Sequence, residues 1–220
     1  MHAIVLDTET TGFEEPQPIE IAYVVLKGPV DLEITAEYCA RFKPSKSISL
    51  GALATHHIMD EDLLDCEPHT AFKLPNVAEY LIGHNVDFDW EAIGKPDIKR
   101  IDTVGIARRL WPTADSHGLG ALMYLLRRDT ARELLKDAHS AAADVRNCVR
   151  LLVHRLPMLK GPKTWEELWQ ISESARIPEI MPFGKHKGMP IKDLPRDYKD
   201  WMLRQADMDP YVLKAVRGEK

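Results

Sequence analysis

The chain has 220 residues, of which 45% are apolar, and a formal net charge of −5 at pH 7. These values fit an ordinary globular protein of one ample domain or one domain with a small appendage, and no apolar run approaches the length of a membrane-spanning helix. The negative charge does not indicate nucleic-acid binding overall. It does not exclude it either, because acids gathered at a metal site count as negative until the metal binds.

Three cysteines, Cys39, Cys66 and Cys148, are odd in number and lack the CxxC spacing. This pattern favours free thiols in a reducing compartment over a disulfide framework or a zinc knuckle. No charged and then apolar leader precedes the first predicted strand. We therefore expect a soluble, cytoplasmic protein.

Short apolar segments bounded by turn residues predict five strands. The predicted strands cover residues 2–9, 18–26, 33–42, 80–84 and 99–102. The turn at 27–31 contains Gly28 and Pro29 and is short enough to join its two flanking strands in an antiparallel pair. The first three strands are therefore expected to form an antiparallel meander.

Helices are predicted to fill most of the remaining chain up to Leu159. Their predicted ranges are 50–57, 60–64, 71–80, 87–93, 102–110, 119–126, 131–135 and 141–156. The last is the longest and carries a clear apolar face. Strands that come first and then alternate with helices indicate a mixed α/β sheet domain over residues 1–160.

Gly161 and Pro162 mark a plausible linker to a small, mostly helical C-terminal module at residues 161–220. Thr164 is a good N-cap for a first helix in this module. Lys185 and Lys187 lie in a loop with Phe183, a composition that suits contacts with a nucleic-acid backbone or, equally, a tight turn. The tryptophans of the module offer a third alternative, which is to cap the core of the main domain.

Two acids end the first predicted strand. Side chains alternate along an extended chain, so Asp7 and Glu9 point to one face and Thr8 points to the other. Two close, buried carboxylates repel each other unless a cation lies between them. Oxygen ligands suit Mg²⁺ or Mn²⁺, although an isolated D-x-E also fits a solvated loop.

Two further polar clusters follow buried segments. The first includes Asn85 and Asp89, and the second runs from His139 into the last predicted helix of the main domain. Ser140 is the expected N-cap of that helix, and Asp144 then lies one turn in, on its apolar face. An acid on an apolar face is anomalous unless it is paired or binds a metal.

These clusters form three motifs in order, D-x-E-T-T-G at 7–12, H-N-x-x-F-D at 84–89 and H-x-x-x-x-D at 139–144. Together they resemble the three motifs of the DnaQ-like DEDDh 3′→5′ exonucleases. One such motif arises easily by chance, whereas three in order over most of the chain are specific. The resemblance implies a ribonuclease H-like mixed sheet flanked by helices.

The resemblance also implies roles for five residues. Four acids would hold two Mg²⁺ or Mn²⁺ ions, and His139 would act as general base; the acids are Asp7, Glu9, Asp89 and Asp144. Two such ions stabilise both the attacking and the leaving oxygen in phosphodiester cleavage, and a histidine can accept a proton near neutral pH. The product implied is a nucleoside 5′-monophosphate released from a 3′ end.

Other residues of the motifs have two interpretations each. Asp87 competes with Asp89 as the third acid, and we favour Asp89 because it fills the acid position of the motif. Substrate contacts are predicted for five side chains, namely Thr8, Thr10, His56, Asn85 and Phe88. Packing is the alternative for Phe88, and His56 could serve either substrate or fold.

The leading hypothesis is a 3′→5′ exodeoxyribonuclease that acts on single-stranded or duplex DNA ends in repair or processing. The alternatives are an RNA-trimming member of the same superfamily and an inactive nucleic-acid-binding module. All four acids and the histidine are present, which disfavours the inactive module. The motifs alone do not determine strand preference, oligomeric state or pathway, because a few contacts outside them read the 2′-hydroxyl.

Overall fold

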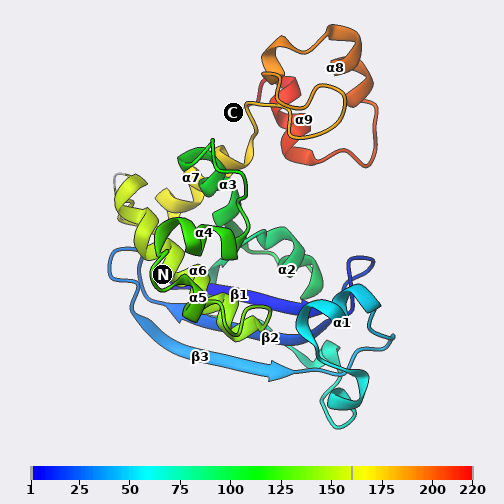
Figure 1. Ribbon diagram of the computed structural model, residues 1–220, viewed down its shortest axis with the longest axis vertical. Coiled ribbons are helices and arrows are strands. Elements are labelled where there is room, and N and C mark those ends of the chain that lie inside the picture. Colours follow the sequence, from blue (N-terminus) through cyan, green and yellow to red (C-terminus); the bar gives the residue numbers. More distant parts are fainter. Residues whose placement is uncertain (1, 160, 220) are drawn as a thin grey trace.

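A mixed five-stranded sheet forms the centre of the protein. The computed structural model describes residues 2–159 and 161–219 (Figure 1). The strands are β1 (His2–Thr10), β2 (Pro18–Leu26), β3 (Ile34–Arg41), β4 (Ala78–Gly83) and β5 (Lys99–Asp102). Their order across the sheet is β3-β2-β1-β4-β5. The predicted meander of β1, β2 and β3 is confirmed, since both of its pairings are antiparallel.

The parallel half of the sheet is shorter than the antiparallel half. β4 pairs in parallel with β1 only as far as Val5, whereas β2 follows β1 almost to its end. The last residues of β1 therefore have a sheet neighbour on one side only. This leaves the backbone from Asp7 onwards accessible to other elements on the β4 side.

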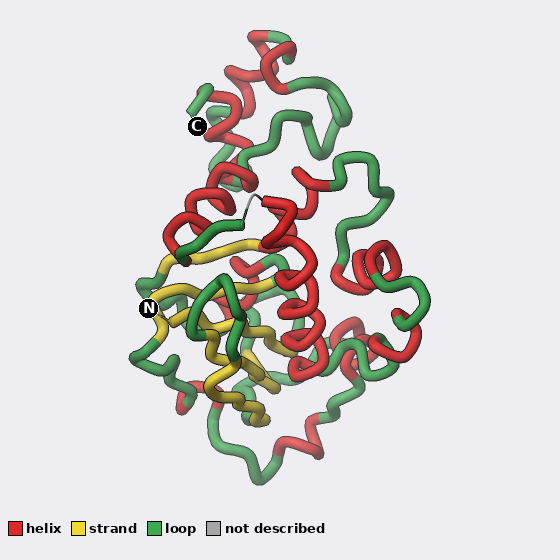
Figure 2. Tube along the Cα trace, turned by 90° about the vertical axis from the view of Figure 1, so that its left-hand side faces the viewer, coloured by secondary structure: helices red, strands yellow, loops and turns green. Residues whose placement is uncertain are grey.

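The described part of the chain contains nine α-helices. They are α1 (Leu50–His56), α2 (Val86–Ala92), α3 (Thr103–Leu110), α4 (Leu119–Leu126), α5 (Ala131–Leu134), α6 (Ala141–Arg155), α7 (Trp165–Arg176), α8 (Arg196–Met202) and α9 (Pro210–Arg217). Of these, α8 and α9 lie away from the sheet (Figure 1). Short 3-10 turns occupy Asp60–Leu63, His69–Ala71, Leu156–Leu159 and Ile191–Asp193. Figure 2 shows the sheet beside the long helix α6.

The two faces of β1 belong to two hydrophobic clusters. Ala3 and Val5 point to the face covered by α3, α6 and α7, where Val145 and Leu152 complete the packing. Ile4 and Leu6 point to the opposite face, where the α2 side chains pack. The alternation along β1 thus decides which helix each later side chain of the strand meets.

The predicted helix at 71–80 is wrong. The chain there makes one 3-10 turn, His69–Ala71, and a turn in which the Ala78 amide donates to the Pro75 carbonyl at 3.1 Å. Pro75 has no amide hydrogen to give to a helix, and from Ala78 onwards the chain pairs with β1 as β4. Sheet pairing therefore outweighs the helix-like spacing of apolar residues in this segment.

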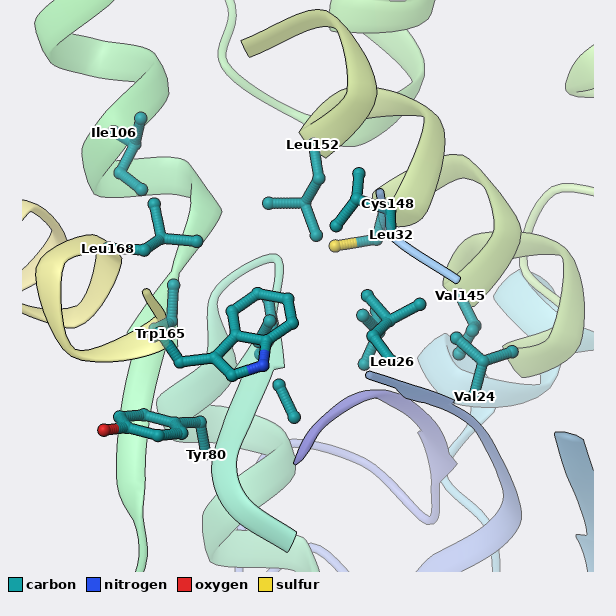
Figure 3. Close-up of a cluster of buried hydrophobic side chains, with 14 of the residues drawn as sticks. Val24, Leu26, Leu32, Tyr80, Ile106, Val145, Cys148, Leu152, Trp165 and Leu168 are labelled. Atoms are coloured by element: carbon teal, nitrogen blue, oxygen red, sulfur yellow. The ribbon is translucent and has the colours of Figure 1, made fainter. Parts of the chain in front are cut away.

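Helix α7 belongs to the core of the main sheet. Its N-cap Thr164 accepts a hydrogen bond from the Glu167 amide at 3.1 Å, as predicted. Trp165 and Leu168 are buried in the same cluster as β4 and β5 side chains (Figure 3). The domain boundary between residues 160 and 161 stays a prediction, but a cut there removes the fully buried Trp165 indole from this core.

A second, smaller core begins after α7. Five buried side chains form it, namely Met181, Ile191, Leu194, Met202 and Val212. They come from the loop after α7 and from α8 and α9, which Figure 1 shows as a separate mass beyond α3 and α7. The two units meet at Arg176, whose guanidinium lies 4.3 Å from the ring of Tyr211 in α9.

None of the helices in the described residues is both long and apolar enough to span a membrane.

We expect Trp165→Ala to lower the free energy of unfolding by about 3–5 kcal/mol, because it removes a fully buried indole from the main core. Trp165→Phe should cost less, since the indole Nε1 has no hydrogen-bond partner among the described residues. Denaturant unfolding followed by circular dichroism measures both. Trp201→Ala is the matched control because Trp201 is 45% exposed. Equal losses for Trp165→Ala and Trp201→Ala would contradict the assignment of α7 to the core.

Candidate active site

The end of β1 brings three carboxylates together. Asp7 and Glu9 continue the face of Ala3 and Val5, which is the face that α6 covers. Asp144, in the first turn of α6, lies opposite them. One ligand oxygen from each of Asp7, Glu9 and Asp144 lies within 4.8 Å of the other two. The predicted shared face of Asp7 and Glu9 therefore meets the predicted inward acid of the long helix.

Asp89 reaches the same region through Thr8. β4 ends before this point, so the Thr8 amide is free to donate to Asp89 Oδ1 at 2.9 Å, and the Thr8 hydroxyl donates to the same oxygen at 2.8 Å. Asp89 is buried on α2, and its second oxygen has no such bond to Thr8. Thr8 thus serves to hold an acid, while its role in binding substrate stays a prediction.

Asp87, the rival third acid, is used elsewhere. Its carboxylate forms ion pairs with Arg100 of β5 and Arg176 of α7. Both of its oxygens are occupied by guanidinium groups, because Oδ1 contacts Arg100 and Oδ2 contacts Arg176. This geometry favours Asp89 over Asp87 as the third ligand.

His139 lies at the entrance to α6. Its backbone amide donates to Asp144 Oδ2 at 3.2 Å, and its side chain is exposed. Its φ of 66° is a left-handed conformation that a histidine adopts rarely. The turn therefore holds Asp144 by its backbone and leaves the imidazole accessible. Ser140 caps the helix as predicted, since its Oγ accepts from the Ala143 amide at 3.4 Å.

Glu20 is a residue of the site that the sequence analysis missed. It lies opposite Glu9 in the β1–β2 register and opposite Arg41 of β3. Its Oε1 accepts from Arg41 Nε at 3.2 Å, and its Oε2 accepts from the Ala141 amide at 3.0 Å. Glu20 thus fixes the start of α6, and with it Asp144, against the sheet. A buried acid within the apolar strand 18–26 was the available signal.

The acids destabilise one another's charged forms. Burial, followed by repulsion from Asp89, Asp144, Glu9 and Glu20, raises the pKa of Asp7 well above its ordinary value of 3.8. Burial and the neighbouring carboxylates raise the pKa of Glu9 to about 8. Burial raises the pKa of Asp89 to about 7 despite its two Thr8 hydrogen bonds, and burial also raises the pKa of Asp144.

This electrostatic pattern fits a divalent-cation site. Among the described residues, no Lys or Arg forms an ion pair with any of the four acids, so their repulsion is uncompensated by the protein. Carboxylate oxygens are the ligands that Mg²⁺ and Mn²⁺ prefer. The donor set and its missing positive charge therefore match the predicted metals.

Two of the predicted substrate contacts are engaged with the backbone. The Thr10 hydroxyl donates to the Gly12 carbonyl at 3.2 Å. His56 is buried, its Nδ1 accepts from the Ile58 amide at 3.0 Å, and its Nε2 therefore carries the proton and donates to the Thr10 carbonyl at 3.3 Å. Both side chains shape the loop that follows β1. Their contacts with substrate stay predictions.

The remaining two predicted contacts lie at the start of α2. Asn85 is exposed, has a φ of 76°, and donates its backbone amide to Asp102 Oδ1 at 2.9 Å. Phe88 is half-buried, and its ring centroid lies 5.8 Å from that of Phe13, which is 91% exposed. The side chains of Asn85 and Phe88 are thus accessible to a ligand, whereas Asp102 is the N-cap of α3.

Comparison with known proteins places this geometry in a family. The family model RNase_T, described as Exonuclease, matches residues 4–152, which include all four acids and His139. The chain belongs to this exonuclease family. The resemblance to the DnaQ-like DEDDh exonucleases and the ribonuclease H-like fold predicted from the three motifs are thereby confirmed. A second model, for a provisionally named quorum-sensing-regulated virulence factor, matches residues 173–207.

Several relatives of this exonuclease are similar over most of its length. Exodeoxyribonuclease 10 of Escherichia coli strain K12 is 26% identical over 208 residues, which cover 92% of this chain and 91% of the relative. A structure of exonuclease X with 5′ overhanging duplex DNA has a TM-score of 0.63 and 25% identity, and the match covers 77% of this chain and 99% of that one. E. coli exonuclease I with a dA16 oligonucleotide shares the fold, with a TM-score of 0.59 and 17% identity, over 81% of this chain and 44% of that one.

We expect the metal-free exonuclease to become less stable as the pH rises from about 4 to about 8. A carboxyl group with a raised pKa keeps its proton longer in the folded than in the unfolded chain. For each proton that the folded chain binds and the unfolded chain has lost, the free energy of unfolding falls by up to about 1.4 kcal/mol for every unit that the pH rises. Thermal unfolding in chelator across this pH range measures the effect.

Asp7→Asn should flatten this pH dependence, and added Mg²⁺ or Mn²⁺ should raise the unfolding temperature of the parent most at high pH. Asp87→Asn is the matched control, since its carboxylate is paired with two guanidinium groups outside the acidic cluster. A parent protein whose metal-free stability rises between pH 5 and pH 8 would contradict the interpretation of the cluster.

Proposed function

We propose that this chain is a 3′→5′ exodeoxyribonuclease that releases nucleoside 5′-monophosphates from DNA ends. The observation that carries the proposal is the convergence of the carboxylates of Asp7, Glu9 and Asp144 within 4.8 Å. Among the described residues, no Lys or Arg forms an ion pair with them, and the chain belongs to the exonuclease family. Asp89 completes the acidic set from α2. Membership of the family supports the reaction class.

Each side chain has a part in this reaction. Asp7, Glu9, Asp89 and Asp144 would hold two divalent cations, for which we propose Mg²⁺ or Mn²⁺. When bound, such ions stabilise the negative charge that develops on the attacking and leaving oxygens of a phosphodiester. His139 takes the proton of the attacking water, since its imidazole is exposed beside Asp144. Thr8 and Glu20 position Asp89 and the start of α6.

DNA is the substrate that the relatives support. Exodeoxyribonuclease 10 is named for DNA, and the structures of exonuclease X and exonuclease I contain duplex and single-stranded DNA respectively. A role in repair or processing is consistent with such a substrate. RNA trimming is the alternative: a DEDDh nuclease bound to rAMP and a 3′-exonuclease that recognises a histone mRNA stem-loop share the fold, but at 16% and 15% identity, below the 26% and 25% of exodeoxyribonuclease 10 and exonuclease X. The odd number of cysteines and their lack of CxxC spacing support a reducing, cytoplasmic location.

The test uses 5′-labelled single-stranded DNA, duplex DNA and RNA of one sequence, each with Mg²⁺, Mn²⁺ or chelator. We expect stepwise shortening of DNA from its 3′ end, with 5′-mononucleotides as products, only when a cation is present. Asp144→Asn should reduce this activity to background while the protein stays folded, because it removes a metal ligand and also a repulsive charge.

Asp87→Asn is the matched control for this assay. It makes the same chemical change at an acid that is paired with Arg100 and Arg176, so turnover should persist even if stability falls. Full activity of Asp144→Asn, or activity of the parent in chelator, would refute the metal-dependent mechanism. Degradation of RNA in preference to DNA would refute the substrate.

We expect His139→Asn to slow cleavage by about 10²–10⁴-fold, which is the usual cost of losing a general base. Asparagine tolerates the left-handed backbone conformation at this position better than most residues, so the turn that holds Asp144 should survive. The deficit should shrink at high pH, where hydroxide from solution replaces the base. A pH–rate profile of the same shape for variant and parent would argue against this role.

A further inference from the structure

Three aromatic rings form a continuous surface on the C-terminal module. The ring of His186 meets that of Tyr198 at 4.5 Å and an angle of 69°, and Tyr198 stacks on Trp201 with centroids 5.3 Å apart and an angle of 29°. We call these three residues the aromatic platform. Trp201 is 45% exposed, and neighbouring Phe183 is 40% exposed. The Trp201 indole, at one end of the platform, is thus the ring that is open to a flat ligand.

The loop before the platform is built to hold its position. The amide of Met181 donates to the Met189 carbonyl at 2.8 Å, and the amide of Gly188 donates to the Met181 carbonyl at 2.9 Å, which closes the loop. Gly184 has a φ of 71°, and a Cβ added there would lie 3.3 Å from the Tyr198 hydroxyl. The loop therefore lies directly against the platform, and glycine permits both the turn and the close approach.

Positive charge surrounds the platform. Lys185 and Lys187 flank His186 in this loop, both are exposed, and neither forms an ion pair with any described residue. Residues 181–204 contain six Lys or Arg and three Asp, a local net charge of +3 in a chain of net charge −5. The charge of this segment is opposite to that of the whole protein, and it complements a polyanion.

A purely structural alternative is that the rings only cover the small core of the module. That core does not need the outer part of the platform, because its buried members are aliphatic or methionine side chains and Met202, beside Trp201, already fills it. Tyr198 packs partly against this core, whereas Trp201 stacks on Tyr198 from the solvent side. Packing of the small core therefore does not account for the exposed part of the Trp201 indole or for Lys185 and Lys187.

We propose that the aromatic platform binds single-stranded DNA, with bases stacked on Trp201 and backbone phosphates held by Lys185 and Lys187. The proposal rests on the proposed function, since it assigns this surface to the same DNA substrate. Stacked bases and paired phosphates are the two contacts that sequence-independent single-strand binding requires. A duplex hides its base faces, so the platform selects unpaired strands.

The platform contributes affinity and no chemistry. It lies on the module that Figure 1 shows beyond α3 and α7, whereas the four acids lie on β1, α2 and α6. A strand whose 3′ end occupies the acidic site can reach the platform only with nucleotides further from that end. Short oligonucleotides should therefore be cleaved without using the platform, and long ones should be held by it.

The test measures binding of the full-length protein to a fluorescent, long oligothymidylate by anisotropy, in chelator so that the DNA stays intact. Trp201→Ala should weaken binding about 10-fold, and Trp201→Phe should retain most of the affinity because a ring remains to stack. Lys185→Ala combined with Lys187→Ala should reduce the slope of log affinity against log salt by about 1.4, or 0.7 for each phosphate contact. Circular dichroism verifies that each variant is folded.

Matched controls remove the same groups elsewhere. Tyr124→Ala deletes an aromatic side chain of α4 that is 48% exposed, and Lys27→Ala with Lys95→Ala deletes two charges that are paired with Glu33 and Glu91. Neither control should change affinity or salt slope. If the folded platform variants bind the oligothymidylate as the parent does, the platform does not contact DNA, and a protein partner becomes the better occupant of this surface.

Cleavage assays separate this proposal from the proposed function. With Mg²⁺ and a short oligonucleotide, the platform variants should match the parent in kcat and KM. With a long oligonucleotide, only KM should rise. A parent that cleaves no DNA would refute the proposed function, whereas an active parent whose platform variants have the same KM as the parent on long DNA would refute the platform alone.

Discussion

Repulsion among buried carboxylates is the constraint on which the arrangement of this protein depends. Asp7, Glu9 and Asp144 lie within 4.8 Å of one another, and Asp89 adds a fourth charge from α2. A fold driven only by stability would separate these groups. Here the rigid sheet and two helix starts hold them together, and the favourable packing elsewhere offsets the cost. Such an arrangement is typical of functional sites, where groups needed for function are held together although this lowers the stability of the fold.

Three hydrogen bonds from backbone amides to carboxylates bring the acids together, and each uses an amide that regular secondary structure leaves unpaired. The early end of β4 frees the Thr8 amide for Asp89. Glu20 accepts the Ala141 amide at the start of α6, and the turn at His139 gives its own amide to Asp144. Strand ends and helix starts supply the donors that anions need. The site therefore forms where the regular elements stop.

The sequence predicts most of this fold because its local signals agree with its packing. The five strands were found within one or two residues, since each is a short apolar segment between turn residues. The predicted helix at 71–80 is wrong because the pairing of Ala78 with β1 is a long-range interaction that no local spacing reveals. Glu20 stands out locally as an acid within an apolar strand, but its role depends on Arg41 and Ala141, which lie far away in the chain. The motifs selected the acids, and the ion pairs of Asp87, which no local pattern reveals, favour Asp89 as the proposed ligand.

Arg176 links the two units of the protein through its side-chain contacts. Its side chain is 4% exposed and contacts Asp87 on α2 and Tyr211 on α9, and a Cβ at Gly105 of α3 would approach it within 3.0 Å. Withdrawing α9 would uncover this guanidinium and loosen the start of the helix that carries Asp89. The two units are therefore joined twice, by the chain that follows α7 and by the side-chain contact of Arg176 with Tyr211. We expect opening of the small unit to reduce the stability of α2, the helix that carries Asp89, because both units share the contacts of this one guanidinium.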